Sequence, residues 1–149
     1  MKLEDEIKQE KFRNGYHKLA VNILYTYGWL LRNQNKLFEK FGITGQQFNI
    51  LRILRGQYPN HATVNMLKER MLDKMSDASR LVERLRIKGW VERTMGDNDR
   101  RCAKVIITDS GLKLLEEIDK FNEFSDKMLS NLNEEETHKL NELLDKLRG

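Results

Sequence analysis

A helical segment that ends at a glycine, followed at once by two strand-like runs, constrains the fold of this chain most strongly. Residues 73–88 present apolar side chains at helical spacing, and Gly89 follows as a glycine that can end a helix in the left-handed conformation. Residues 90–95 and 103–107 then have the composition of short strands. Glycine, aspartate and asparagine occupy the turn between them, as in tight turns. The order predicts a β-hairpin directly after a helix.

A long helical segment is predicted at the start of the chain. Apolar residues keep helical spacing from about residue 4 to residue 41. Gly15 and Gly28 lower the helix propensity within this segment, so we expect them to bend it or to split it in two. Gly42 is expected to end it.

Two shorter helices are predicted between this segment and the helix that directly precedes the hairpin. Thr44 and Gln47 have the spacing of a capping box, which predicts a second helix ending near residue 56. Thr63 is a suitable N-cap for a short third helix. The fourth helix is expected to begin near residues 73–76. Three short helices therefore precede the hairpin.

The remaining elements complete a mainly α-helical fold with a small β-hairpin. A further pairing strand is expected near His61. Thr108 is a predicted cap for a helix that carries apolar positions up to Ile118 and that either ends there or continues to Phe121 and Phe124. Asn133 with Glu136 predicts the last helix. We interpret this order as a winged helix-turn-helix in which the hairpin is the wing.

Composition narrows the kind of partner. The 149 residues carry a net charge of +4, with basic residues in excess over residues 1–104 and acidic residues in excess over 105–149. This asymmetry favours a polyanionic partner for the first part of the chain. Apolar runs are far shorter than the ~20 residues that span a membrane, the N-terminus is charged, and a single cysteine excludes an internal disulfide. We therefore expect a soluble, cytoplasmic protein without a membrane partner.

The fourth helix supplies the chemistry of DNA recognition. A helix fits the major groove of double-stranded DNA, where residues near its N-terminal half reach the base edges. Candidate DNA-binding residues lie on the polar face of this helix: Ser76, Asp77, Ser79, Arg80 and Arg84. Asp77 could accept a hydrogen bond from a cytosine amine or stabilise the helix N-terminus. Their alternative interpretation is a solvated, internally paired helix face.

The hairpin tip supplies a second set of candidates. Arg100 and Arg101 can enter a minor groove, and Asp99 can orient a guanidinium through charge-assisted hydrogen bonds. A solvated hairpin tip is the alternative interpretation. Further contacts with phosphates are expected from four other basic residues: Arg52, Arg55, Lys68 and Lys88.

These segments resemble the MarR family of bacterial transcriptional regulators. The resemblance rests on GITGQQFNILRIL at 42–54, LKER at 67–70, SDASRLVERLRIKGWVER at 76–93, Asp-Arg-Arg at 99–101, and Ile-Thr with Gly111 at 107–111. It implies a single domain over 1–149, with a DNA-binding lobe at about 42–110 and dimerisation helices at about 1–41 and 111–149.

The family resemblance also implies a function. The expected protein is a homodimer that binds a pseudo-palindromic operator, most often as a repressor, and that releases DNA when a small aromatic or phenolic effector binds. By position, Arg101 is the expected minor-groove arginine and Asp99 its partner. Gly96 and Asp97 depart from the acidic residue and the proline that relatives often have there.

Other functions find less support in the residues. No paired carboxylates, nucleophile motif or phosphate loop indicates an enzyme, and the three histidines lack neighbours at ligand spacing, so we expect neither catalysis nor a metal or cofactor. A winged-helix adaptor that binds protein rather than DNA is the alternative function. Cys102 is interpreted as a packing residue rather than a redox sensor. Aromatic residues expected in the core or interface, with an effector pocket as the alternative, are Tyr25, Trp29, Phe41 and Phe48.

Overall fold

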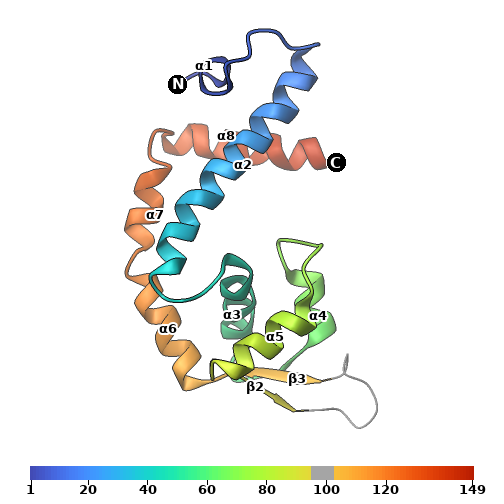
Figure 1. Cartoon of the computed structure of the whole chain (residues 1–149), viewed down its shortest axis with the longest axis vertical. Coiled ribbons are helices and arrows are strands. Elements are labelled where there is room, and N and C mark those ends of the chain that lie inside the picture. Colours follow the sequence, from blue (N-terminus) through green and yellow to red (C-terminus); the bar gives the residue numbers. More distant parts are fainter. Residues whose placement is uncertain (95–102) are drawn as a thin grey trace. The chain divides into compact units, whose positions relative to one another are not determined.

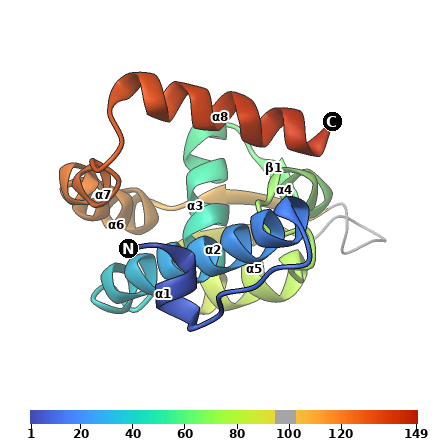
Figure 2. The ribbon, with the colours of Figure 1, turned by 90° about the horizontal axis from the view of Figure 1, so that it is seen from above.

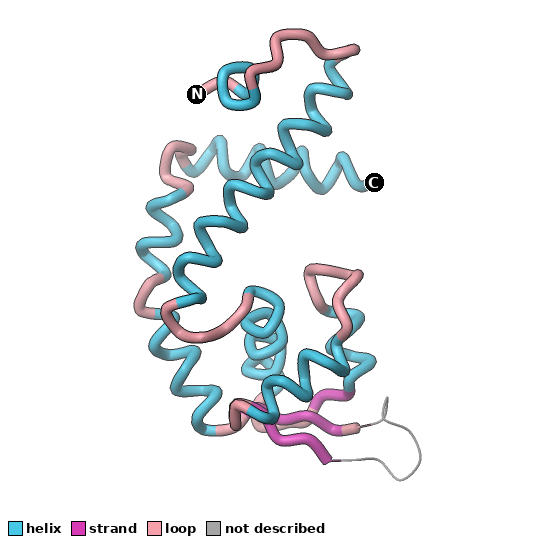
Figure 3. Tube along the Cα trace, in the orientation of Figure 1, coloured by secondary structure: helices cyan, strands magenta, loops and turns pink. Residues whose placement is uncertain are grey.

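The computed structural model describes residues 1–94 and 103–149. Helices dominate the described chain, together with a small sheet (Figures 1 and 3). In chain order the elements are α1 Leu3–Ile7, α2 Gly15–Glu39, α3 Gly45–Gln57, β1 Ala62–Thr63, α4 Val64–Arg70, α5 Ala78–Ile87, β2 Val91–Thr94, β3 Lys104–Ile107, α6 Asp109–Asp119, α7 Asn122–Met128 and α8 Glu134–Arg148.

The chain divides into two compact units, Met1–Phe48 and Asn49–Gly149. In the first unit, α1 ends at Lys8, which has a left-handed backbone, and the Asn14 side chain caps α2 by accepting from the His17 N–H. The predicted long helix is therefore split close to Gly15. It is not split at Gly28, since α2 continues through that residue.

Two further contacts hold the segment before α2 onto that helix. Lys18 pairs with Glu4, and the Tyr25 hydroxyl donates to Glu6 Oε2 at 2.6 Å. Gly42 follows α2 with a φ of 64°, which confirms it as the glycine at the end of the long helix.

Local capping sets most helix starts as the sequence predicts. The Thr44–Gln47 capping box is confirmed, since each residue's backbone N–H donates to the other's side chain at 3.1 Å. Thr63 accepts from the Met66 N–H and Thr108 from the Gly111 N–H, so both predicted N-caps are confirmed. The capping box that begins α8, the long helix ending at the C-terminus in Figure 2, is also confirmed.

A three-stranded antiparallel sheet with the order β1-β3-β2 lies in the second unit. β3 pairs on one side with β2, where Val91 is opposite Ile107, and on the other with β1, where Ala62 is opposite Val105. The short β1 confirms the strand expected near His61. Because β3 alternates, Val105 and Ile107 face the core, and the sheet closes one side of the second unit.

The core of the second unit holds α5 in place. Side chains from α3, α4, α5, the sheet and α6 are almost completely buried there: Ile50, Leu51, Leu54, Leu67, Val82, Leu85, Val105 and Leu115. The whole predicted apolar face of the fourth helix is buried: Ala78, Leu81, Val82 and Leu85. A side chain at Gly111 would overlap the Trp90 carbonyl oxygen and lie 2.7 Å from Ile107 Cγ1. Glycine at 111 therefore allows α6 to begin directly against the hairpin.

One predicted boundary is wrong, and the structure decides a second that the sequence left open. The fourth helix begins at Ala78 rather than near residues 73–76, because Asp77 provides the cap and residues 71–77 form a turn. Phe124 does not continue the helix after Thr108, since α6 ends at Asp119 and Phe124 lies on the separate α7. No helix in the described ranges is long and apolar enough to cross a membrane.

Candidate nucleic-acid interface

Helix α5 is held between a buried face and a capped end. It packs against α4 and β2 (Figure 1). Its cap is the Asp77 side chain, which accepts from the Arg80 N–H at 3.1 Å. Gly89 follows with a φ of 79°, which confirms the predicted glycine at the end of this helix. Of the two roles considered for Asp77, the structure supports stabilisation of the helix N-terminus. The backbone of α5 is thus fixed independently of any ligand.

The outer face of α5 carries exposed positive charge. Ser79, Arg80 and Arg84 are all exposed. Among the described residues, neither the Arg80 nor the Arg84 guanidinium has an ion-pair partner. The two arginines lie four residues apart, so they project from the same side of the helix on consecutive turns. Within the described part of the chain, this face can meet a polyanion without first breaking an internal pair.

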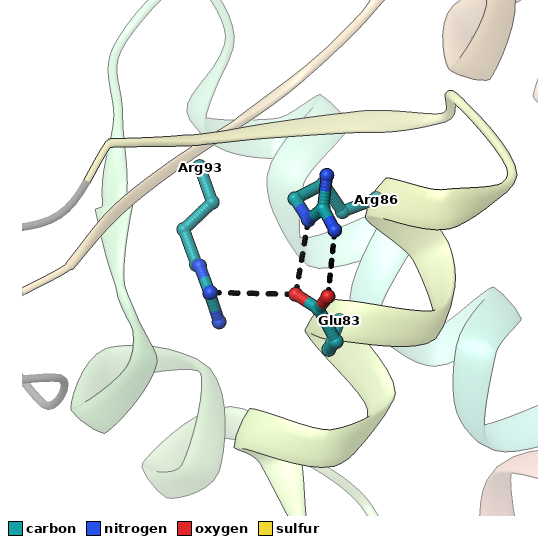
Figure 4. A network of polar contacts seen from close by, with 3 residues as sticks. All are labelled: Glu83, Arg86 and Arg93. Carbon is teal, nitrogen blue, oxygen red and sulfur yellow. Dashed lines mark hydrogen bonds and ion pairs between the residues drawn. The ribbon is translucent and has the colours of Figure 1, made fainter.

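A carboxylate network occupies the other part of the same helix. Glu83 accepts two hydrogen bonds from Arg86, at 2.7 and 3.0 Å, and its Oε2 lies 3.3 Å from Arg93 Nη2 on β2 (Figure 4). The Glu83 hydrogen bonds raise the pKa of Arg86 above its usual value. The network joins the helix to the first strand of the hairpin. It also compensates part of the charge of Arg86 and Arg93.

Ser76 lies differently from the expectation. It belongs to the turn before α5, and its hydroxyl is buried without a hydrogen-bond partner among the described groups. The sequence analysis placed Ser76 at the start of the fourth helix, whereas Asp77 caps α5 and Ser76 precedes that cap. Asp73 instead accepts from the Met75 N–H, which closes a turn.

The hairpin tip and its predicted residues fall outside the described ranges. Asp99, Arg100 and Arg101, together with Cys102, lie in this part of the chain. Their roles stay predictions from the sequence.

The four basic residues expected to contact phosphate differ in their surroundings. Arg55 donates to both carboxylate oxygens of Asp119 on α6, at 2.6 and 3.3 Å, so its guanidinium is already engaged within the second unit. Lys88 lies over the Trp90 ring, with Nζ 4.9 Å from the ring centroid. Lys68 and Arg52 are exposed.

The aromatic candidates for an effector pocket all belong to the first unit. Tyr25 donates to Glu6, which raises the pKa of its phenol, and Phe48 stacks on Phe38 with centroids 4.7 Å apart. Their role, in the core or interface or in an effector pocket, stays a prediction. Within the described ranges, no group of three or more His, Cys, Asp or Glu side chains is placed to hold a metal ion.

Sequence reasoning missed Asn49 on α3. Its side-chain Oδ1 accepts from the Leu72 N–H at 2.9 Å, across 23 residues of chain. This bond ties the turn before α5 to the core helix. Asparagine is unfavourable inside a helix. Its presence there was the one sign in the sequence that this side chain has a specific hydrogen-bond partner.

The comparisons with known proteins agree with this geometry. A profile described as the MarR family matches residues 41–101. The HTH-type transcriptional regulator PecS of Dickeya dadantii is 30% identical over 148 residues, which cover 91% of this chain and 87% of PecS. The chain belongs to the MarR family.

Two further relatives extend this assignment. The transcriptional repressor MprA of Escherichia coli is 33% identical over 89 residues, or 60% of this MarR-family chain. The match covers 51% of MprA, so the chain spans about half the length of that curated relative. A mutant MarR from Escherichia coli, solved in complex with operator DNA, has a TM-score of 0.76 and 27% identity, with 99% of each chain covered. The winged-helix fold is therefore shared with a protein captured on DNA.

Proposed function

We propose that this MarR-family protein is a sequence-specific, double-stranded-DNA-binding transcriptional repressor that acts as a homodimer on a pseudo-palindromic operator. The observation that carries the proposal is the outer face of α5, where Arg80 and Arg84 are exposed and unpaired among the described residues while the opposite face is buried. A helix of this kind suits the major groove. The repressor MprA and the MarR–operator complex support the same function.

Arg80 and Arg84 take different roles in this proposal. Arg80 lies in the first turn of α5. In a recognition helix, the residues of the N-terminal end contact the base edges. Its guanidinium can bind guanine O6 and N7 together, which specifies a base. Arg84 lies one turn further on and contacts phosphate, which adds affinity without sequence preference. Arg100 and Arg101 contact the neighbouring minor groove, with Asp99 orienting Arg101.

The exposed leucines of α8 support a homodimer. Leu140, Leu143 and Leu147 are 44%, 50% and 54% exposed and recur at helical spacing. A second copy of the chain would cover such a stripe. Two-fold symmetry then predicts two half-sites about one helical turn apart on one face of the DNA. Release of DNA by a small aromatic or phenolic effector completes the proposal, and it is tested by adding such compounds to the bound complex.

The experiment is a binding titration with duplexes from around the protein's own gene. Binding is measured by fluorescence anisotropy at two salt concentrations, with random duplex as competitor. A specific complex with two protomers per site and a steep loss of affinity with salt is expected, because neutralised phosphates release counterions. Binding that is no tighter than to random duplex, and that hardly changes with salt, would instead favour the protein–protein adaptor.

Arg80→Ala is the variant that tests the proposed readout. It should weaken operator binding by roughly 1–3 kcal/mol and relax the preference at one base pair. Arg84→Ala should weaken binding to all duplexes about equally. Lys127→Ala on α7 removes the same charge from an exposed site and serves as the matched control. If Arg80→Ala and Lys127→Ala behave alike, α5 is not the reading helix.

A further inference from the structure

The turn between α4 and α5, residues 71–77, exposes two large apolar side chains. Met75 is 92% exposed and Leu72 is 87% exposed. Apart from Met1, these are the most exposed large apolar residues of the described chain. Single apolar residues on a surface need no explanation, but turns favour polar residues, and two such side chains share this short turn.

Specific hydrogen bonds fix the backbone of this turn. Asn49 Oδ1 accepts from the Leu72 N–H at 2.9 Å, and Asp73 Oδ1 accepts from the Met75 N–H at 2.9 Å. The Ser76 N–H donates to the Asp73 carbonyl at 3.2 Å. The exposure of Met75 and Leu72 therefore belongs to an ordered turn.

The charges around the turn indicate a polyanion as the partner. Lys68, Arg70 and Lys74 are exposed beside it, together with one carboxylate, Glu69. Arg80, which has no ion-pair partner among the described residues, follows in the first turn of α5. The two acidic groups within the turn are engaged by the backbone, since Asp73 bonds to the Met75 N–H and Asp77 caps α5. Basic side chains therefore outnumber acidic ones around the apolar pair Leu72 and Met75.

The position of Met75 narrows the partner to one chemical group. Met75 comes two residues before the N-cap of α5, at the helix end proposed to enter the major groove. On the base edges of that groove, the apolar group is the 5-methyl of thymine. The unbranched, polarizable methionine side chain adapts well to such a contact.

We propose that Met75, with Leu72 beside it in the turn, contacts thymine 5-methyl groups in the operator and so contributes to sequence specificity. This inference rests on the proposed function. It adds an apolar reading element to the arginines of α5.

The test replaces thymine by deoxyuridine, which removes the methyl group and leaves base pairing intact. Single replacements are made through one half-site of the tightest-binding duplex, and the dissociation constant is measured for each. At one or two positions, wild-type protein should lose about fourfold in affinity, as expected for about 0.8 kcal/mol per buried methyl-sized group. Met75→Ala should bind the thymine and deoxyuridine duplexes equally well.

Three further variants separate a direct contact from a structural role. Met75→Leu keeps an apolar side chain of similar volume and should keep the discrimination, whereas Met75→Gln should lose it. Ile87→Ala removes a 71%-exposed apolar side chain at the other end of α5 and should leave the discrimination unchanged. Thermal unfolding of each variant checks that the fold is intact.

The outcomes distinguish this inference from the proposed function. Specific, salt-dependent binding with no effect of deoxyuridine at any position would overturn the inference and leave the regulator intact. Equal discrimination by wild-type and Met75→Ala proteins would do the same. A change of oligomeric state in Met75→Ala, without a change in discrimination, would assign the turn to a protein interface. Absence of specific DNA binding would overturn both proposals.

Discussion

Helices α5 and α8 have similar amphipathic patterns, yet their apolar faces have different surroundings. Leu81 and Leu85 on α5 are 6% and 0% exposed, whereas Leu143 and Leu147 on α8 remain about half exposed. Sequence periodicity alone does not distinguish the two cases, because both give leucine at helical spacing. The apolar face of α5 is therefore buried within the chain, and its polar face is available to a partner. On α8 it is the apolar face that is available.

The largest expected effect is on assembly. Leu143→Asp places a charge in the apolar stripe of α8, and two-fold symmetry places it twice in the proposed interface. Losing one buried leucine from each protomer costs roughly 3–6 kcal/mol, which is at least about a hundredfold in the dimer dissociation constant. Sedimentation equilibrium measures the change.

The matched control for this prediction lies on the polar face of the same helix. Asn141→Asp introduces the same charge at an exposed position and should leave the dimer intact. A Leu143→Asp protein that remains dimeric at micromolar concentration would assign the dimer interface to another surface.

The next effect is on the stability of the second unit. Leu85→Ala on α5 leaves a cavity in a fully buried site and should lower the free energy of unfolding by roughly 2–5 kcal/mol. Leu147→Ala makes the same chemical change on α8, where the side chain is 54% exposed. It should mainly weaken the concentration dependence of unfolding. Urea unfolding at two protein concentrations measures both quantities, and equal losses in the two variants would contradict the contrast between the helices.

Short-range features of the fold could be predicted from the sequence. The helix caps were identified correctly, because a cap bonds to a backbone group three residues away. These caps are Thr44 with Gln47, Thr63, Thr108 and Asn133. The buried face of α5 followed from periodicity for the same reason. Such features depend on neighbouring residues and on little else.

Long-range features could not be predicted in this way. The fourth helix was expected to begin near residues 73–76. The bond from the Leu72 N–H to Asn49, which orders the turn found there, joins residues 23 positions apart in the sequence. Arg55 was expected to contact phosphate, and no acidic residue lies within four positions of it in the sequence. Its partner, Asp119, is 64 residues away and is brought close only by the fold.

The smallest expected effect concerns the charge left on the outer face of α5. Glu83 lies between Arg86 and Arg93, whereas Arg80 and Arg84 have no ion-pair partner among the described residues. Glu83→Gln removes the negative charge that compensates Arg86 and Arg93, and leaves these two arginines available to phosphate. Affinity for random duplex should therefore rise a few-fold, with the salt slope steeper by up to about 0.9 for each additional phosphate neutralised.

A matched carboxylate on α8 controls for the change in net charge. Glu142 pairs with His138 and Lys139, so Glu142→Gln removes one negative charge away from the proposed DNA-binding face. Anisotropy titrations with random duplex at several salt concentrations compare the two variants. If Glu83→Gln instead weakens binding, the carboxylate acts by orienting Arg93 and the hairpin strand that carries it. The affinity of the α5 surface for DNA would then depend on a fixed position of β2 as well as on Arg80 and Arg84.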